Sequence, residues 1–588
     1  MSYVVATAGH VDHGKSTLVK RLTGMEPDRW EEERQRGLTI DLGFVWADID
    51  GQDVAFVDVP GHERFIANML AGVGPAPAVM LVVAADEGVM AQTVEHMAAI
   101  DGFGIRTGVI AVTRADRAEG ERRQTTRAQI ADAVARTTLQ DWPVVEVSAV
   151  TGEGLDELRT ALAEVLRAAP APDAGARVRF WVDRSFTVKG AGTVVTGTLT
   201  AGTIRPGDTL ALRGEEVQVR SVQSEDAPID TATPARRVAL NLRGVDAERV
   251  GRGDALTTPG AWHRTALVDV VLAVSPPEGG TCEELPREAV AHIGTAGVGC
   301  RVRSLGPAFA RLTLEEPLPL TLGDTIVLRG TGGQRILAGL TAIDVDPEPF
   351  TRRGDAARRA EELDPDPDVS REIARRVAVT PAHLARLGFE VGDTPPAGSI
   401  AFAGYWIRAE QVMSWKEQLI AAVAEYEQAN PLGAGLSVGA GVEKLGLPDA
   451  KLLPLAAAAA KLTVRGGVIS SGRDLDLGPG IAKLEAHLER DPFAAPEARD
   501  LEAWHVGAKE LAAAERAGRV IRIADGVVLL PDAPARAAAL LRGIEQPFTA
   551  SDARKAWGTT RRVAIPLLEL LDAQGKTRRV AGTQRVVV

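Results

Sequence analysis

A glycine-rich stretch near the start of the chain has the residue types and spacing of a phosphate-binding loop. Gly9 is followed by four residues and then by Gly14, Lys15 and Ser16, between an apolar run and a helix-like run. Backbone N–H groups of such a loop can surround a triphosphate, and the helix N-terminus adds the positive end of its dipole. We expect Lys15 to reach the β and γ phosphates and Ser16 to bind magnesium. The residues expected to cradle the nucleotide are Gly9, His10, Val11, Asp12, His13, Gly14, Lys15, Ser16 and Thr17.

Two further motifs supply what a nucleotide-hydrolysing site needs around the terminal phosphate. Asp58 and Gly61 follow an apolar run at 54–57, which predicts an acid near magnesium and a glycine amide near the γ-phosphate. Thr39 precedes that run, in a segment where a mobile switch could bring a second magnesium ligand over the γ-phosphate. We therefore expect Ser16, Thr39 and Asp58 to hold the metal.

Two motifs at the ends of later apolar runs are suited to guanine. They contain Thr113, Arg114 and Asp116 in one case, and Ser148 and Ala149 in the other. The carboxylate of Asp116 can accept two hydrogen bonds from the guanine edge, which adenine cannot supply, and the Ala149 N–H can donate to O6. The planar head of Arg114 can lie on the face of the base. Because each motif is expected at the carboxyl end of a strand, the sequence predicts a GTPase.

The composition is that of an ordinary soluble globular protein, with 588 residues, 45% apolar and 25% charged. Its length suggests about four domains. The only cysteines, Cys282 and Cys300, argue against a disulfide framework and fit a reducing compartment. The chain opens with no signal sequence, and its longest apolar run, 79–85, is too short to span a bilayer. We therefore expect a cytoplasmic protein with no membrane partner.

The pattern of elements changes along the chain. Alternating strands and helices near the start predict a parallel sheet covered on both faces. Short runs rich in valine and threonine, separated by glycine and proline, then predict β-barrels. The remaining residues are rich in alanine, leucine, glutamate and arginine, and their helical patches end in short apolar strands about every 60 residues, which is typical of degenerate winged-helix units.

The predicted fold class is therefore multidomain: an α/β P-loop GTPase domain, two β-barrel domains, and an α-rich C-terminal array of four winged-helix units. The expected bounds are 1–170 for the GTPase domain, 175–260 and 261–346 for the barrels, and 350–412, 413–475, 476–532 and 533–588 for the winged-helix units.

The end of the chain is basic although the whole chain carries a net charge of −12. Residues 547–588 hold eight cations and three acids, a net charge of +5, which is the footprint expected for a phosphate backbone. Because Pro566 cannot sit deep in a helix, we expect the regular helix to begin near Ile565. The residues expected to meet phosphate, at its exposed N-terminal end and on the adjacent wing, are Thr559, Thr560, Arg561, Arg562, Arg578 and Arg579.

These motifs resemble a known family. Residues 9–17, 37–40 and 58–62 resemble the translational GTPases of the elongation factor Tu group, and residues 38–44 and 61–66 are similar to the selenocysteine-specific elongation factors, SelB. The resemblance implies that His62 orients the attacking water and that Asp12 helps to hold a monovalent cation. It also implies GTP/GDP and Mg²⁺ as cofactors.

The same resemblance implies a substrate and partners. A family member delivers selenocysteinyl-tRNA to the ribosome at UGA codons, hydrolyses GTP there, and binds a selenocysteine-insertion hairpin of the mRNA through its last winged helix; we expect a monomer. The resemblance points to Asp183, Arg184 and Arg237 for the selenocysteine pocket, because a guanidinium pair would favour a selenolate over a neutral hydroxyl. The family usually has Gly-Gln-Arg where this chain has Ala235, Arg236 and Arg237, so the arginine that faces the pocket stays open.

Three other functions compete with this one. A general translation GTPase with an unrelated tail would bind ordinary aminoacyl-tRNAs. A winged-helix nucleic-acid-binding regulator gated by nucleotide would bind duplex DNA without a preference for a hairpin. A metabolic GTPase, such as a sulfate-activating subunit, would have no use for the basic tail.

Overall fold

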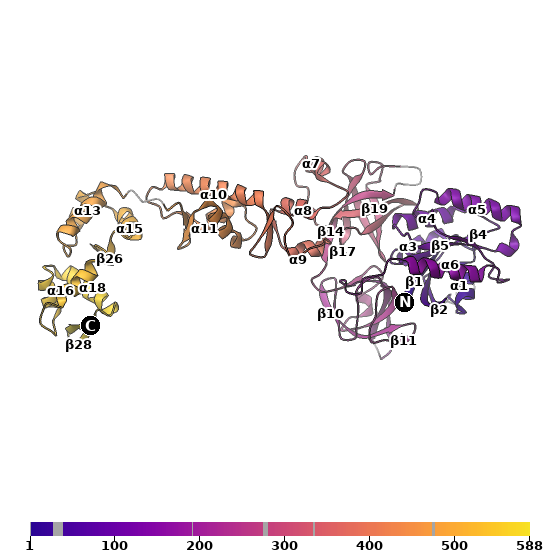
Figure 1. Ribbon diagram of the computed structural model, residues 1–588, viewed down its shortest axis with the longest axis horizontal. Helices are drawn as coiled ribbons and strands as arrows, with labels where there is room; N and C mark the ends of the chain where they lie inside the picture. The colour runs from indigo at the N-terminus through magenta and orange to yellow at the C-terminus, as the bar shows by residue number, and fades with distance from the viewer. Residues whose placement is uncertain (1, 28–38, 191, 275–279, 333–334, 473–476) are drawn as a thin grey trace. The chain divides into compact units, whose positions relative to one another are not determined.

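The computed structural model describes residues 2–27, 39–190, 192–274, 280–332, 335–472 and 477–588 (Figure 1). The motif residues Arg36, Gly37 and Leu38 lie outside these ranges. The chain divides into two compact units, one made of residues 1–372 with 381–393, and the other of residues 373–380 with 394–588.

The first domain is built on a six-stranded sheet of order β2-β3-β1-β4-β5-β6, in which β2 runs antiparallel to β3 and the other pairs are parallel. Its strands are β1 (Ser2–Ala8), β2 (Gly43–Ile49), β3 (Gln52–Asp58), β4 (Ala78–Ala84), β5 (Gly108–Thr113) and β6 (Val144–Glu146). Its helices are α1 (Lys15–Thr23), α3 (Ile66–Val73), α4 (Ala91–Gly102), α5 (Gly120–Val134) and α6 (Leu155–Ala168).

Apolar side chains alternate between the two faces of this sheet. Val4 packs in a core with α3, α4 and α5, whereas its neighbour Val5 packs in a core with α1 and α6. The predicted parallel sheet with helices on both faces is confirmed. The loops that follow β1, β3, β5 and β6 carry the motifs singled out above, so these motifs gather at the carboxyl edge of the sheet.

Two β-barrels follow, as predicted. The first has the strand order β11-β10-β12-β8-β7-β13-β9 and closes through an additional β9–β10 pairing; the second is a closed barrel of order β14-β17-β16-β15-β18-β19. The first barrel consists of β7 (Arg179–Val188), β8 (Gly192–Leu199), β9 (Thr209–Leu212), β10 (Glu215–Ser224), β11 (Ala227–Pro228), β12 (Arg236–Arg243) and β13 (Ala255–Thr257). The second consists of β14 (His263–Val274), β15 (Glu288–Ile293), β16 (Ala296–Ser304), β17 (Phe309–Leu320), β18 (Thr325–Gly330) and β19 (Ile336–Asp344).

In the rest of the chain, helices followed by a β-hairpin occur four times within the described ranges. The first set is α7 (Asp355–Glu362), α8 (Val369–Arg376), β20 (Ala378–Val379), α9 (Pro381–Leu387), β21 (Ser399–Phe402) and β22 (Tyr405–Arg408). The second is α10 (Ala409–Ala429), β23 (Leu436–Ser437), α11 (Val438–Leu445), α12 (Leu453–Ala460), β24 (Thr463–Arg465) and β25 (Val468–Ser470). The third is α13 (Gly478–Arg490), α14 (Ala498–Ala503), α15 (Ala508–Arg516), β26 (Ile521–Ala524) and β27 (Val527–Leu529). The fourth is α16 (Ala533–Leu541), α17 (Ala550–Ala556), α18 (Arg561–Ala573), β28 (Thr577–Ala581) and β29 (Gln584–Val587).

The cores of these repeats extend over more than one repeat. One cluster of buried side chains runs from Ala378 in the first repeat to Ile469 in the second, and α10 continues through the expected boundary at 412. A separate cluster runs from Leu477 in the third repeat to Leu571 in the fourth. The third and fourth repeats therefore share one hydrophobic core.

The expected start of the last long helix was wrong. Helix α18 begins at Arg561, four residues before Ile565, and contains Pro566 in its interior. Pro566 is the sixth residue of the helix, and it removes one intrahelical hydrogen bond, the one that would reach the carbonyl of Arg562. Apolar contacts of the helix with the shared core outweigh that loss; the buried residues are Val563, Ala564, Leu567, Leu568 and Leu571.

Among the described helices, none is both long and apolar enough to cross a membrane.

Candidate functional site

The glycine-rich loop leads directly into α1, as the spacing predicted. Gly14 precedes the helix with φ of +83°, a conformation that favours glycine, and Lys15 is the first helical residue. The Lys15 ammonium donates to the carbonyl of Gly9 at 3.0 Å and to the carbonyl of His10 at 2.9 Å. Its positive charge is thus held inside the loop, where the phosphates of a nucleotide are expected.

The three predicted metal ligands lie together. Ser16 Oγ donates to Asp58 Oδ2 at 2.6 Å and lies 3.1 Å from Thr39 Oγ1. The other oxygen of the fully buried Asp58 accepts from Thr7 Oγ1 at 2.7 Å, which fixes the carboxylate. Two hydroxyls and a carboxylate are the hard oxygen ligands that Mg²⁺ prefers, so this donor set fits the metal.

Gly61 and His62 follow β3 at the same edge. Gly61 packs so closely on the loop that a methyl group there would overlap Lys15 Nζ and Val11 N. The Nδ1 atom of half-buried His62 accepts from the backbone N–H of Arg64 at 3.2 Å. That bond orients the ring and makes Nε2 the nitrogen that could bind a water molecule.

The base-recognition motifs also lie together, with one change of role. Asp116 accepts from Ser148 Oγ at 2.5 Å, and this hydrogen bond lowers the pKa of the exposed Asp116 carboxyl. Ala149 is the next residue after Ser148. Thr113, by contrast, is buried and donates to the carbonyl of His13 at 2.6 Å, so its side chain supports the phosphate loop.

Arg114 connects the base-recognition motif with the phosphate loop. Its guanidinium donates to the carbonyl of Asp12 and, at 2.5 Å, to Glu87 Oε1. Both Arg114 and Asp12 have positive φ, 53° and 62° respectively. Asp12, the expected neighbour of a monovalent cation, is therefore held through its carbonyl.

Sequence reasoning missed two residues of α4 that support the loop. Gly9 N donates to Nδ1 of the buried His96 at 2.8 Å, and Val11 N donates to Gln92 Oε1 at 3.2 Å. Burial lowers the pKa of His96 to about 3, so its ring stays neutral and can accept the bond. Burial likewise lowers the pKa of His13 to about 4. The spacing of Gln92 and His96, one helical turn apart, was the available signal.

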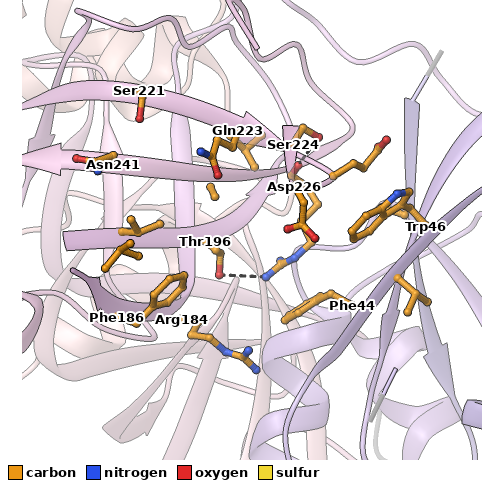
Figure 2. A pocket seen from close by; sticks show the side chains of 18 residues that line it. Phe44, Trp46, Arg184, Phe186, Thr196, Ser221, Gln223, Ser224, Asp226 and Asn241 are labelled. Atoms are coloured by element: carbon orange, nitrogen blue, oxygen red, sulfur yellow. Dashed lines mark hydrogen bonds between the residues drawn. The ribbon is translucent and has the colours of Figure 1, made fainter. Parts of the chain in front are cut away.

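A cavity of about 350 Å³ lies between the first domain and the first barrel, within one compact unit. Figure 2 shows Phe44 and Trp46 of β2 on one side and Ser221, Gln223 and Asn241 of the barrel on the other. Half of its lining residues are polar or charged, among them Arg184, Arg237, Glu225 and Asp226, so the cavity is suited to a small polar group.

Arg237 lines this cavity and Arg236 does not. Two nitrogens of Arg237 bind the two oxygens of the buried Asp183, and Nη2 also donates to Thr196 Oγ1 at 3.1 Å. Arg236, the next position along β12, instead donates to Ser2 Oγ at 2.5 Å. Alternation along the strand thus directs Arg237, and not Arg236, to this cavity.

Phe44 lies against both candidate arginines. The Arg237 guanidinium carbon is 3.3 Å from the centroid of the Phe44 ring and that of Arg184 is 5.4 Å away. Asp183 is not among the residues that line the cavity; it supports Arg237 from behind.

The structure divides the basic residues of the last repeat into two groups. Arg561, Arg578 and Arg579 are exposed, as is Thr560 before α18. Thr559 is buried and donates to the carbonyl of Phe493 at 2.5 Å.

Arg562 also belongs to the supporting group. Its Nη2 donates to the carbonyl of Pro496 at 2.8 Å and to that of Gly526 at 2.5 Å, both in the third repeat. Arg585, which the charge count included, is buried and binds Asp572. Arg562 is nevertheless exposed, and the exposed Arg579 has its Nε 3.6 Å from Asp572 Oδ2, so some of the cations at the surface are also bound to the protein itself.

Known proteins resemble the chain in each of these parts. Family models match residues 2–168 (elongation factor Tu GTP binding domain), 192–257 (elongation factor Tu domain 2), 288–349 (selenocysteine-specific elongation factor, beta-barrel domain) and 539–586 (elongation factor SelB, winged helix). These matches, with the fold, are typical of the translation elongation factors that are built on an elongation factor Tu type of GTP-binding domain.

Individual relatives narrow the class. The selenocysteine-specific elongation factor of Escherichia coli (strain K12) is 38% identical over 357 residues, 60% of this chain and 56% of that protein. A crystal structure of a bacterial selenocysteine-specific elongation factor matches with a TM-score of 0.80 and 26% identity, covering 100% of both chains. SelB from Methanococcus maripaludis in complex with the GTP analogue GPPNHP matches with a TM-score of 0.51 and 25% identity, covering 59% of this chain and 80% of that one.

The chain is thus similar to the selenocysteine-specific elongation factors, in sequence over 60% of its length and in structure over its whole length. In the sequence matches it spans a little over half the length of the curated relatives.

Proposed function

We propose that this protein is a GTP-dependent elongation factor that delivers selenocysteinyl-tRNA to the ribosome at UGA codons and hydrolyses GTP there. It would act in the cytoplasm, as a monomer. Four features support the proposal: the phosphate loop, the group of three oxygen ligands, the paired arginines at the cavity, and the exposed cations of the last repeat.

GTP would bind along the carboxyl edge of the sheet. Lys15 would exchange the carbonyls of Gly9 and His10 for phosphate oxygens, and Asp116 would accept from guanine. Ser16, Thr39 and Asp58 would hold Mg²⁺, which offsets phosphate charge when bound.

Hydrolysis would depend on His62, whose Nε2 would orient the attacking water, since Nδ1 is occupied by the Arg64 N–H. GDP has no γ-phosphate, so the hydroxyl of Thr39 would no longer be held at the metal and the γ-phosphate. The segment around Thr39 would then be released. A monovalent cation near Asp12 remains a prediction.

The aminoacyl end of the tRNA would enter the cavity beside Phe44. Selenocysteine is ionised at neutral pH, whereas the hydroxyl of serine is not. Charge-assisted hydrogen bonds from Arg184 and Arg237 would therefore favour the selenolate. The observation that carries this assignment is the position of both guanidinium groups against one aromatic ring at the cavity wall.

The last repeat would bind the mRNA hairpin through its exposed cations. Thr560 and Arg561 lie at the N-terminus of α18, where backbone N–H groups can also meet phosphate, and Arg578 and Arg579 lie on the adjacent hairpin. A hairpin offers a shaped backbone and splayed loop bases to such a surface.

Competition between selenocysteinyl-tRNA and seryl-tRNA for the GTP-bound protein tests the proposal. The wild type should prefer the selenocysteinyl form, and Arg184→Ala and Arg237→Ala should lose that preference. Arg236→Ala is the matched control, because its side chain points away from the cavity. If Arg237→Ala misfolds, Arg237→Lys can replace it, because lysine keeps a positive charge beside Asp183. Equal binding of the two tRNA forms by the wild type would refute the assignment and favour a general translation GTPase.

A further inference from the structure

A carboxylate next to the predicted metal site contacts the wall of the aminoacyl cavity. Asp41 is two residues after Thr39, in the segment that leads into β2. Its Oδ2 accepts from Arg184 Nη2 at 3.3 Å, and its Oδ1 accepts from Arg252 Nη2 at 2.5 Å. Arg184 also donates to the carbonyl of Leu42 at 3.1 Å. A single side chain of the nucleotide domain thus holds two arginines of the first barrel.

Arg252 connects to the same segment by a second route. Its Nη1 donates to Asn68 Oδ1 at 2.8 Å, and Asn68 Nδ2 donates to the carbonyl of Ile40 at 2.9 Å. Asn68 lies on α3, the helix that follows His62 and η1 (Glu63–Phe65). The segment after Thr39 and the segment after His62 are therefore both tied to one barrel arginine.

The contacts continue to the second arginine of the cavity. Arg252 Nε donates to the backbone carbonyl of Asp183 at 3.0 Å, and the carboxylate of Asp183 binds Arg237. Both cavity arginines therefore belong to this network. Arg184 contacts Asp41 directly, and Arg237 is linked to Arg252 through Asp183.

Asp41 is paired with two arginines, with Oδ2 3.3 Å from Arg184 Nη2 and Oδ1 2.5 Å from Arg252 Nη2. The side chains of Asp41, Arg184 and Arg252 are 27%, 22% and 29% exposed, so water screens the pairs only in part.

We propose that Asp41 is a positioning residue that couples the nucleotide state to the affinity of the aminoacyl cavity. The inference rests on the proposed function. When Thr39 is held at the metal and γ-phosphate, Asp41 is fixed two residues away and orients Arg184 at the cavity wall. When Thr39 is released, Asp41 no longer fixes Arg184 or Arg252, and the cavity binds the aminoacyl group more weakly. Residues 39–42 thus have two arrangements, and the nucleotide and the aminoacyl-tRNA each shift the equilibrium between them.

The test compares the affinity for selenocysteinyl-tRNA of the full chain bound to a non-hydrolysable GTP analogue with that of the GDP form. In Asp41→Asn, which keeps the shape and removes the charge, the ratio of the two affinities should fall about tenfold. The loss should come from the GTP-analogue form. Because coupling is reciprocal, the tRNA should also raise the affinity for the GTP analogue about tenfold less than in the wild type.

Three more variants sharpen the comparison. Arg252→Met should reproduce the effect, and the double variant should lose no more than the stronger single variant, since both changes break one network. Asp53→Asn is the matched control, because Asp53 pairs with Arg236 between the same two domains but away from Thr39; its ratio should stay at the wild-type value.

An unchanged ratio in Asp41→Asn would overturn the inference while the proposed function stands. If both nucleotide states had lost affinity equally, that result would indicate a purely structural role for Asp41. A wild type that binds selenocysteinyl-tRNA equally in both states, or that does not prefer it over seryl-tRNA, would instead refute the proposed function.

Discussion

Replacing the adjacent arginines Arg561 and Arg562 by alanine should have two different effects on the last repeat. Arg561 is exposed at the start of α18, where it is available to a phosphate. The guanidinium of Arg562 is bound to the carbonyls of Pro496 and Gly526 in the third repeat. The two side chains have the same charge and adjoining positions, so a charge count alone predicts the same result for both.

The magnitudes follow from these contacts. Arg562→Ala removes two charge-assisted hydrogen bonds, one of them exposed, and should lower the stability of the C-terminal repeats by about 1–3 kcal/mol. Arg561→Ala should change stability by less than about 0.5 kcal/mol. The loss of one phosphate contact in Arg561→Ala should reduce the slope of log Kd against log salt concentration by about 0.7–0.9. Arg562→Ala should leave that slope unchanged.

The assay is binding of the full chain to the mRNA hairpin across a salt series, together with thermal denaturation of each variant. Arg536→Ala is a suitable control: Arg536 is in the same repeat and pairs with Asp532 on the surface, away from the start of α18. A reduced salt slope in Arg562→Ala with unchanged stability would refute the assignment of this arginine as a support.

Two further predictions concern buried groups. Arg237→Leu leaves the carboxylate of Asp183 buried without its guanidinium partner, and should lower the stability of the first barrel by about 3–5 kcal/mol. The double variant Arg237→Leu/Asp183→Leu should regain part of this loss. Thermal denaturation of the two variants is the measurement that checks both expectations. Because the pKa of His96 is about 3 in the folded protein and near 6.5 when exposed, the unfolded chain binds more protons between these values, so stability should fall as pH drops from about 6.5 toward 3. His96→Gln keeps an acceptor for Gly9 N and should lose stability less steeply over this range; equal slopes for both proteins in denaturation experiments would contradict the role given to His96.

The nucleotide site was largely predictable because its motifs are local. Each motif directly follows an apolar strand, and parallel strands bring their carboxyl ends to one edge, so Ser16, Asp58 and Asp116 could be placed without coordinates. Thr113 was recognised as part of the motif. Its bond to the carbonyl of His13 depends on how two loops pack, and residue types do not specify that packing.

Contacts between distant segments were not predictable. His96 and Gln92 reach the phosphate loop across more than 80 residues, and Arg252 reaches Asp41 across 211. The spacing of Gln92 and His96 by one helical turn is the only local signal, and it does not tell which loop these side chains contact. Similarly, a count of cations treats Arg585 and Arg561 alike, although the first is buried against Asp572. The start of α18 was misjudged because the rule for proline weighed one lost hydrogen bond and omitted the buried face of the helix.

The hydrophobic core that the third and fourth repeats share limits how this protein can be divided or recombined. A fragment beginning at 533 would separate Phe493, Val506 and Val528 from Trp557 and Leu567, and would uncover apolar surface on the part that carries the cations. A stable fragment that carries these cations should therefore begin at 477. For the same reason, the last two repeats should be transplanted together into another protein, because part of the core beneath the exposed cations lies in the third repeat.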